Sequence, residues 1–118
     1  MSTNTESHRL ANLMIANGMC VLFVGLLAGV MLVFSLLGVV TIWPLPEWHV
    51  LVPGSTRGWQ AAHVGGILNG VMISGAALLA LHLQLVGRRM QWVGYGMIIT
   101  GWANTVFYWA GLLAPTRA

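Results

Sequence analysis

The sequence predicts an all-α integral membrane protein, a helical bundle of three transmembrane helices at about residues 10–40, 57–86 and 90–114. The first reason is composition, because 58% of the 118 residues are hydrophobic and only 6% are charged, whereas soluble domains carry about 25% charged residues. The second is that each apolar run is long enough to cross a bilayer, which takes roughly 20 residues. We therefore expect a single membrane domain over residues 1–118.

The first predicted span, residues 10–40, is interrupted only by glycines and a few small polar residues. No small-residue cleavage pattern follows a short apolar core, so we interpret it as a retained span rather than a signal peptide. A proline-rich stretch at 41–54 ends this helix, since proline cannot continue one. Ser55 or Thr56 is then a suitable N-cap for the second helix.

The second span is predicted to end in a tight turn at "GRR" (87–89), and Pro115 is expected to stop the third. This topology places Arg9 and the 88–89 pair on one side of the membrane, and Arg57 and Arg117 on the other. The positive-inside bias favours a cytoplasmic N-terminus in a multi-pass protein of the cell inner membrane. Five scattered arginines form no basic patch, so we expect no nucleic-acid partner.

His63 is an ionisable residue inside the second predicted span. Its imidazole either bonds a carbonyl across a helix interface or ligates a metal or haem through a neutral nitrogen. His82 cannot share that iron, because 19 residues on one helix separate the two by about 28 Å. An iron held by His63 alone keeps an open face, which suits substrate chemistry better than fast electron transfer.

Small residues recur every four positions along the second span, at Ala62, Gly66, Gly70 and Ser74. Such a seam allows close approach of another helix or of a flat ligand. Helix packing is the ordinary interpretation, and the alternative is that Gly66 and Gly70 give room to a porphyrin ring beside His63.

Polar residues also recur every four positions on the third span, at Thr100, Asn104 and Tyr108. A stripe on one face at membrane depth indicates either interhelical hydrogen bonding or a lined pocket. Asn69, six residues after His63, points about 120° away from it around the helix. It could serve a cofactor ligated by a neighbouring subunit, which suggests an oligomer with shared sites.

Two segments, "VPGSTRGWQAAHVGGILNG" (52–70) and "GWANTVFYWAGLLAPTR" (101–117), resemble the styrene oxide isomerase family, and the resemblance covers about residues 9–117. It implies a membrane helical bundle that assembles as a homotrimer, with haem b at the subunit interfaces. The family's haem-ligating His falls on His63, its pocket Asn on Asn69 and its pocket Tyr on Tyr108.

The resemblance implies an isomerase that converts an aryl epoxide of the styrene oxide type to an aldehyde by Meinwald rearrangement, with ferric iron as the Lewis acid. We expect Tyr108, Asn69 and Thr100 as catalytic residues, and His63, Gly66 and Gly70 at the cofactor. A small hydrophobic epoxide and the lipid bilayer are the expected partners.

This sequence departs from the family at several points. Thr100 replaces an acidic residue, Asn17 replaces a His, and the family's fourth membrane helix is lacking from the predicted spans. Two alternatives therefore stay open. One is a non-catalytic haem b-binding membrane protein, such as a sensor, carrier or electron-transfer subunit, and the other is a structural subunit with no cofactor.

Overall fold

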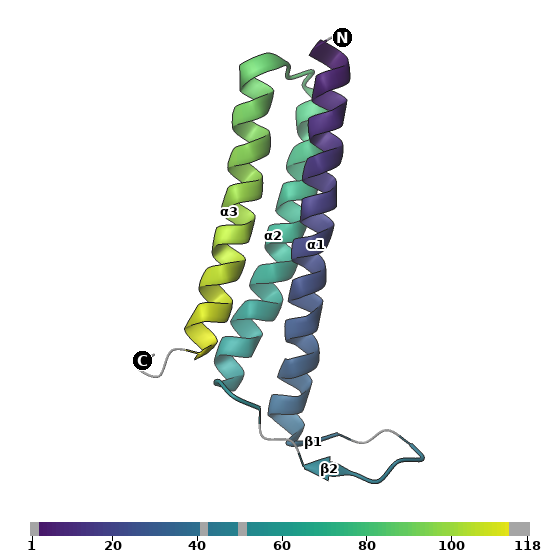
Figure 1. The fold of residues 1–118 in the computed structure, drawn as a ribbon, viewed down its shortest axis with the longest axis vertical. Coiled ribbons are helices and arrows are strands. Elements are labelled where there is room, and N and C mark those ends of the chain that lie inside the picture. The colour runs from purple at the N-terminus through teal and green to yellow at the C-terminus, as the bar shows by residue number, and fades with distance from the viewer. Residues whose placement is uncertain (1–2, 41–42, 50–51, 114–118) are drawn as a thin grey trace.

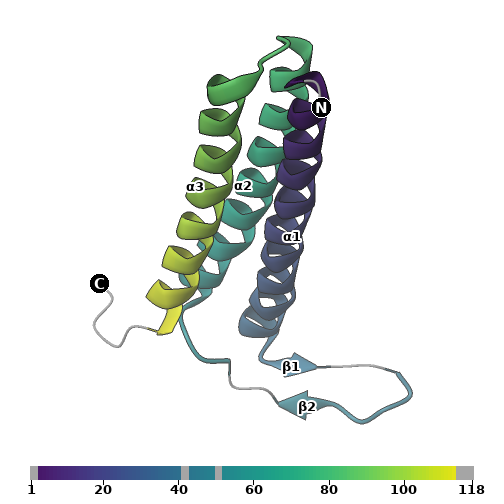
Figure 2. The same ribbon diagram turned by 45° about the horizontal axis from the view of Figure 1, so that its top comes forward.

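Three long helices make up most of the computed structural model, which describes residues 3–40, 43–49 and 52–113 (Figure 1). The elements in chain order are α1 (Thr3–Leu37), β1 (Val39–Val40), β2 (Trp48–His49), α2 (Thr56–His82) and α3 (Gly87–Leu113). Successive helices run in opposite directions, so the N-terminus and the α2–α3 connection lie at one end and the β1–β2 hairpin at the other (Figures 1 and 2). The predicted all-helical class is confirmed, apart from this short hairpin.

Helix α1 differs from its predicted bounds at both ends. It begins at Thr3 rather than near residue 10 and ends at Leu37 rather than at residue 40. Gly38 stops it in the left-handed region, with φ +69° and its N–H donating to Phe34 O at 2.8 Å. The two valines that follow then pair antiparallel with Trp48 and His49, since β-branched residues favour extended backbone.

Helix α2 begins where the sequence predicts. Ser55 is the N-cap, with φ −89° and ψ 151°, and its Oγ accepts the backbone N–H of Gly58 at 3.0 Å. One turn later the indole of Trp59 donates to Pro53 O at 2.8 Å. The residues that directly precede α2 are therefore anchored to its beginning.

The α2–α3 connection lies earlier than the predicted "GRR" turn, so the predicted span of 57–86 is too long. Gln84 has φ +57°, and its backbone N–H donates to Leu81 O at 3.0 Å. The backbone N–H of Leu85 donates to Ala80 O, also at 3.0 Å. These two bonds form a Schellman motif that ends α2 at His82. The arginines at 88–89 consequently lie in the first turn of α3.

Glycines bring the backbones of α1 and α2 into close contact. A Cβ added at Gly66 would lie 2.5 Å from the Cα of Gly25, and one added at Gly70 would lie 2.6 Å from the carbonyl oxygen of Gly18. The seam therefore serves helix packing. Within one chain α1 thus occupies the space beside Gly66 and Gly70, and their expected place at a cofactor stays a prediction.

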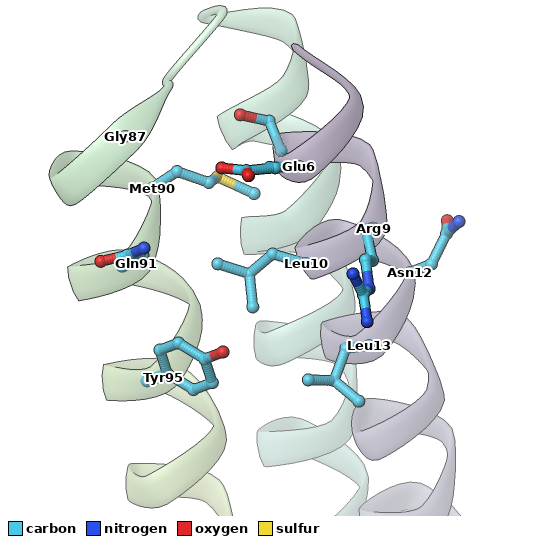
Figure 3. Close-up of a pocket in the computed structure, with 10 residues that line it drawn as sticks. Glu6, Arg9, Leu10, Asn12, Leu13, Gly87, Met90, Gln91 and Tyr95 are labelled. Atoms are coloured by element: carbon cyan, nitrogen blue, oxygen red, sulfur yellow. The ribbon is translucent and has the colours of Figure 1, made fainter. Parts of the chain in front are cut away.

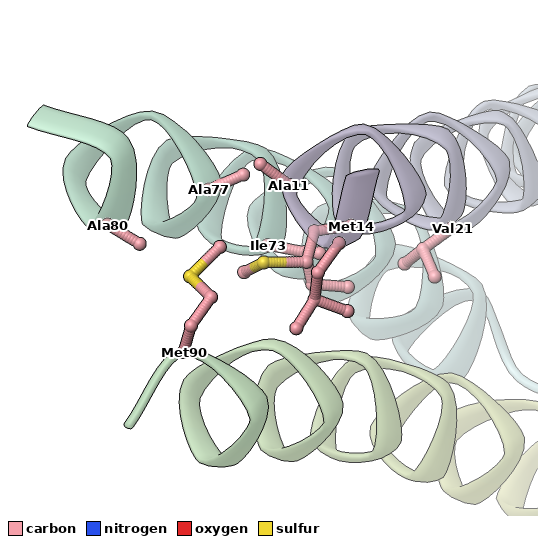
Figure 4. Packing of buried hydrophobic residues seen from close by; sticks show 8 residues of the cluster. Ala11, Met14, Val21, Ile73, Ala77, Ala80 and Met90 are labelled. Carbon is pink, nitrogen blue, oxygen red and sulfur yellow. The ribbon is translucent and has the colours of Figure 1, made fainter. Parts of the chain in front are cut away.

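Side chains from all three helices converge in a hydrophobic cluster nearer the N-terminal end of the bundle (Figure 4). Its largest fully buried members are Met14, Val21, Ile73 and Met90. A second cluster lies toward the hairpin end, where Trp59 meets Trp109 edge to face with ring centroids 5.2 Å apart. The two clusters fix the relative placement of the residues between them.

Much of the outer surface is apolar, as a membrane protein requires. Leu36, Leu78 and Phe107 are 65%, 61% and 69% exposed, with many other large hydrophobic side chains. Among the described residues, two helices are long and apolar enough to cross a membrane, over Thr5–Leu37 and Thr56–His82. Helix α3, which carries the polar stripe, is not one of these two.

Candidate functional site

The imidazole of His63 is bonded to the backbone of the neighbouring helix. Its Nδ1 lies 2.8 Å from the carbonyl oxygen of Gly25 on α1. Because a carbonyl oxygen only accepts, Nδ1 carries the proton and Nε2 keeps its lone pair in the neutral ring. Among the residues that the structure describes, Nε2 has no hydrogen-bond partner. The half-buried ring thus presents one unused metal-ligating nitrogen.

Gly29, one turn beyond Gly25 on α1, makes the space for this ring. A Cβ added at Gly29 would lie 2.5 Å from both Nδ1 and Cε1 of His63. Helix α1 therefore supplies both the acceptor that orients the imidazole and the gap that admits it.

The protein side chains near His63 fit a metal cofactor in which most of the metal's ligands belong to the cofactor itself. No group of three or more His, Cys, Asp or Glu side chains able to hold a metal ion occurs in the described parts of the chain. A neutral imidazole whose Nδ1 bonds a carbonyl is a common axial ligand of haem iron, and the porphyrin nitrogens supply the four equatorial ligands. His63 fits that role, and a bare metal ion would lack protein ligands.

A second polar feature joins α2 to α3. Asn69 donates from Nδ2 to Gly65 O at 2.7 Å and accepts at Oδ1 from Asn104 Nδ2 at 3.0 Å. The side chain of Asn69 is buried, whereas that of Asn104 is half-buried. We call Asn69 and Asn104 the amide pair. The hydrogen bond within this pair links the side chains of α2 and α3.

The ring of Tyr108 packs against Gly65 of α2, one helical turn from Asn69. A Cβ at Gly65 would collide with this ring, so the missing side chain at Gly65 admits it against α2. Gly65 also accepts the Asn69 amide through its carbonyl. Tyr108 Oη has no hydrogen-bond partner among the residues described. The structure thus places Asn69, Asn104 and Tyr108 on neighbouring turns of the α2–α3 contact.

Thr100 does not join this group. Its side chain is exposed, and its hydroxyl donates to Gly96 O within α3 at 2.7 Å. The structure shows no hydrogen bond from Thr100 to Asn69, Asn104 or His63. The expected catalytic role of Thr100 therefore has no geometric support within one chain.

His63 and the amide pair lie on different sides of α2. The imidazole bonds to α1, whereas the Asn69 amide bonds to α3. This agrees with the angular separation expected from their six-residue spacing. One chain consequently does not place the potential axial ligand and the polar group around a single small molecule.

A groove of about 710 Å³ lies between the beginnings of α1 and α3, away from these residues (Figure 3). Leu10 and Tyr95 point into it (Figure 3). It contains none of the sequence-predicted site residues, so it does not identify the site.

Two parts of the site were missed by sequence reasoning. The polar stripe of the third span identifies Asn104 as one of three polar residues on a face. It does not indicate that Asn69 of α2 is the hydrogen-bond partner of Asn104. The Gly25 carbonyl has no sequence signal of its own, although glycines at 25 and 29 have the four-residue spacing typical of close helix contacts.

Comparison with known proteins identifies the relatives of this chain. A sequence model of the styrene oxide isomerase family matches residues 10–118. The styrene-oxide isomerase of Pseudomonas fluorescens is 36% identical over 112 residues, which cover 93% of this chain and 65% of that protein. The chain thus spans just under two thirds of the length of this relative. Positions 63, 69, 104 and 108 lie within the range that the family model matches. The chain belongs to the styrene oxide isomerase family.

Proposed function

We propose that this protein is a membrane epoxide isomerase that converts an aryl epoxide of the styrene oxide type to the corresponding aldehyde. The proposal is supported by family membership over nearly the whole chain and by the polar cluster of Asn69, Asn104 and Tyr108 in an apolar bundle. The observation that carries the mechanism is the free Nε2 of His63, whose opposite nitrogen is committed to Gly25 O.

His63 is the residue that would hold haem b. The hydrogen bond from Nδ1 to Gly25 O fixes the tautomer and raises the basicity of Nε2, which favours binding of iron there. Gly66 and Gly70 take no part in this proposal, because they pack against α1.

The site is completed between subunits of a homotrimer. His63 and the amide pair face different neighbours within one chain, so His63 of one subunit meets the polar cluster of the next. The apolar outer faces of the helices supply surface for this association and for contact with lipid.

Bound ferric haem supplies a Lewis acid for the epoxide oxygen. Tyr108 Oη and an amide N–H of the pair donate hydrogen bonds to the same oxygen, which gains negative charge as the benzylic C–O bond breaks. The surrounding apolar side chains exclude water, which would otherwise trap the benzylic cation as a diol.

The rearrangement balances within the substrate. The benzylic C–O bond breaks, a hydride moves from the terminal carbon to the benzylic carbon, and the oxygen forms a carbonyl with the terminal carbon. No electron donor or acceptor is consumed, and the isomeric aldehyde is released.

All three helices cross the inner membrane in this proposal, with the N-terminus in the cytoplasm. The beginnings of α1 and α3 lie at the same end of the bundle (Figure 1). They carry the arginines at positions 9, 88 and 89, as the positive-inside bias requires of a cytoplasmic face. Asn104 and Tyr108 of α3 then face the site rather than lipid.

Detergent-purified protein, incubated with styrene oxide without NAD(P)H, flavin or oxygen, tests the function. We expect phenylacetaldehyde to accumulate in proportion to protein, while a heat-denatured sample gives only the background rate. Haem-containing protein that forms no aldehyde would instead favour the non-catalytic haem protein. A stoichiometric requirement for a reductant would contradict the isomerase mechanism.

A further inference from the structure

The amide pair is asymmetric, and the asymmetry assigns a role to each member. Asn69 is only 7% exposed, and both of its polar atoms are engaged, Nδ2 with Gly65 O and Oδ1 with Asn104. A buried amide with this environment has one orientation, because turning it by 180° would set its oxygen against the Gly65 carbonyl. Asn69 is therefore a rigid acceptor for Asn104.

Asn104 is the member with unused hydrogen-bonding groups. One N–H of its Nδ2 donates to Asn69, and its second N–H has no partner among the described residues. Its side chain is half-buried, so it reaches the surface of the three-helix unit. Tyr108 lies four residues later, on the same face of α3.

We propose that Asn104 is the amide that donates to the epoxide oxygen, and that Asn69 is a positioning residue that acts through Asn104. This inference rests on the proposed function. An epoxide oxygen has two lone pairs and no proton, so it needs a donor. Asn104 supplies that donor beside Tyr108, whereas Asn69 spends one N–H on its own helix and is enclosed.

The bond to Asn69 decides which group Asn104 presents. Since Asn69 offers only Oδ1 to its partner, Asn104 must turn its nitrogen toward α2. Removing that acceptor would let the Asn104 amide rotate and present its oxygen, which repels the epoxide oxygen. The hydrogen bond strengthens as the C–O bond breaks, so its loss lowers kcat more than it raises KM.

The chain itself suggests a substitution that separates the two roles. Thr100 and Thr105 donate to the carbonyl four residues earlier at 2.7 and 2.8 Å, the same bond that Asn69 makes to Gly65. Asn69→Thr therefore keeps the donor to Gly65 O and an acceptor for Asn104, but it has no second N–H. Asn69→Val places a side chain of the same shape as threonine at this position, but without the hydroxyl group.

Four variants then test the proposal by steady-state kinetics of aldehyde formation. We expect Asn104→Ala to lower kcat by about 100-fold, the usual size for loss of a donor to a developing oxyanion. Asn69→Val should lower kcat almost as much. Asn69→Thr should stay within about fivefold of the original kcat, because fivefold corresponds to the net contribution of one neutral hydrogen bond. The Asn69→Val/Asn104→Ala double variant should be no slower than Asn104→Ala.

Gln91→Ala is the control, since it removes an exposed amide from the same helix and should leave kcat unchanged. If Asn104→Ala lowers the yield of folded protein, Asn104→Leu repeats the test with a side chain of similar size. Wild-type kcat in Asn104→Ala would overturn the proposal. So would an Asn69→Thr variant as slow as Asn69→Val, because Asn69 itself would then be the donor.

A binding measurement keeps this inference separate from the proposed function. The affinities of styrene oxide and cyclopropylbenzene, which has the same shape without the oxygen, are compared by stopped-flow tryptophan fluorescence before conversion. We expect a preference for the epoxide that Asn69→Thr keeps and Asn104→Ala abolishes. Protein with this preference but no turnover would refute the isomerase and leave the assignment of Asn104 standing. No preference in the unmodified protein would overturn the assignment.

Discussion

His63 Nδ1 donates to the carbonyl oxygen of Gly25 at 2.8 Å, where glycines bring the backbones of α1 and α2 together. Gly66, three residues after His63 on α2, packs against the Cα of the same Gly25. The helix crossing and the orientation of the imidazole are therefore one structural feature. A change that separates α1 from α2 should therefore alter the orientation of the His63 imidazole before it alters the rest of the bundle.

Gly29→Ala should weaken haem binding. The added Cβ would lie 2.5 Å from Nδ1 and Cε1 of His63, so the ring must rotate away from Gly25 O or α1 must shift. Loss of a partner that orients a metal-ligating His costs about 10- to 100-fold in affinity. Haem titration followed by absorbance measures this change. Gly96→Ala is the control, because nothing lies within 4 Å of a Cβ there, and unweakened binding by Gly29→Ala would contradict the geometry.

Gly66→Ala should destabilise the helix pair itself. Its Cβ would meet backbone of Gly25 at 2.5 Å, and backbone cannot turn aside as a side chain can. Overpacking of this kind costs about 1–3 kcal/mol of unfolding free energy. Thermal unfolding in detergent, followed by circular dichroism, measures the loss.

Gly75→Ala on the same helix is the matched control for Gly66→Ala. A Cβ at Gly75 meets nothing within 4 Å. Replacing a helical glycine there should stabilise by about 0.5–1 kcal/mol. Equal behaviour of the two variants would show that the glycine contact does not hold α1 against α2.

Trp102→Phe should weaken the α1–α3 contact. The Trp102 indole donates to Asn17 Oδ1 at 3.0 Å, while Asn17 Nδ2 bonds Leu13 O at 2.9 Å. Loss of this hydrogen bond should lower the free energy of unfolding by about 1 kcal/mol. A double-mutant cycle with Asn17→Ala measures the coupling, and strictly additive effects would contradict the bond.

The sequence predicted which segments are helical better than where they end. Composition and apolar run length gave three helices, and the Ser55 N-cap followed from residue type alone. The end of α1 depends on Gly38 adopting positive φ, and the end of α2 on Gln84 doing so. A non-glycine residue at positive φ is rare, so the second boundary had no clear sequence signal.

The candidate site shows the same division. Periodicity placed His63 and Asn69 on different faces of one helix, and the structure bears this out. Periodicity does not say which helix covers which face, so neither the Gly25 carbonyl nor the pairing of Asn69 with Asn104 could be foreseen. In the sequence, the glycine seam of α2 was consistent with contact to another helix or to a flat ligand. Only the three-dimensional structure shows that it packs against α1.

Tyr108→Phe should lower turnover without changing haem content. The substitution removes only Oη, and the ring keeps its place against Gly65. If Oη donates to the developing oxyanion, kcat should fall by about 100-fold. Aldehyde formation per haem measures the effect, and unchanged turnover would remove Tyr108 from the site.

The absorption spectrum of the purified protein, expressed with ample haem, tests most directly whether His63 holds the cofactor. We expect a Soret band that is lost in His63→Ala and retained in His82→Ala, which removes an exposed imidazole from the end of the same helix. A colourless wild-type protein, or a Soret band of undiminished intensity in His63→Ala, would contradict it.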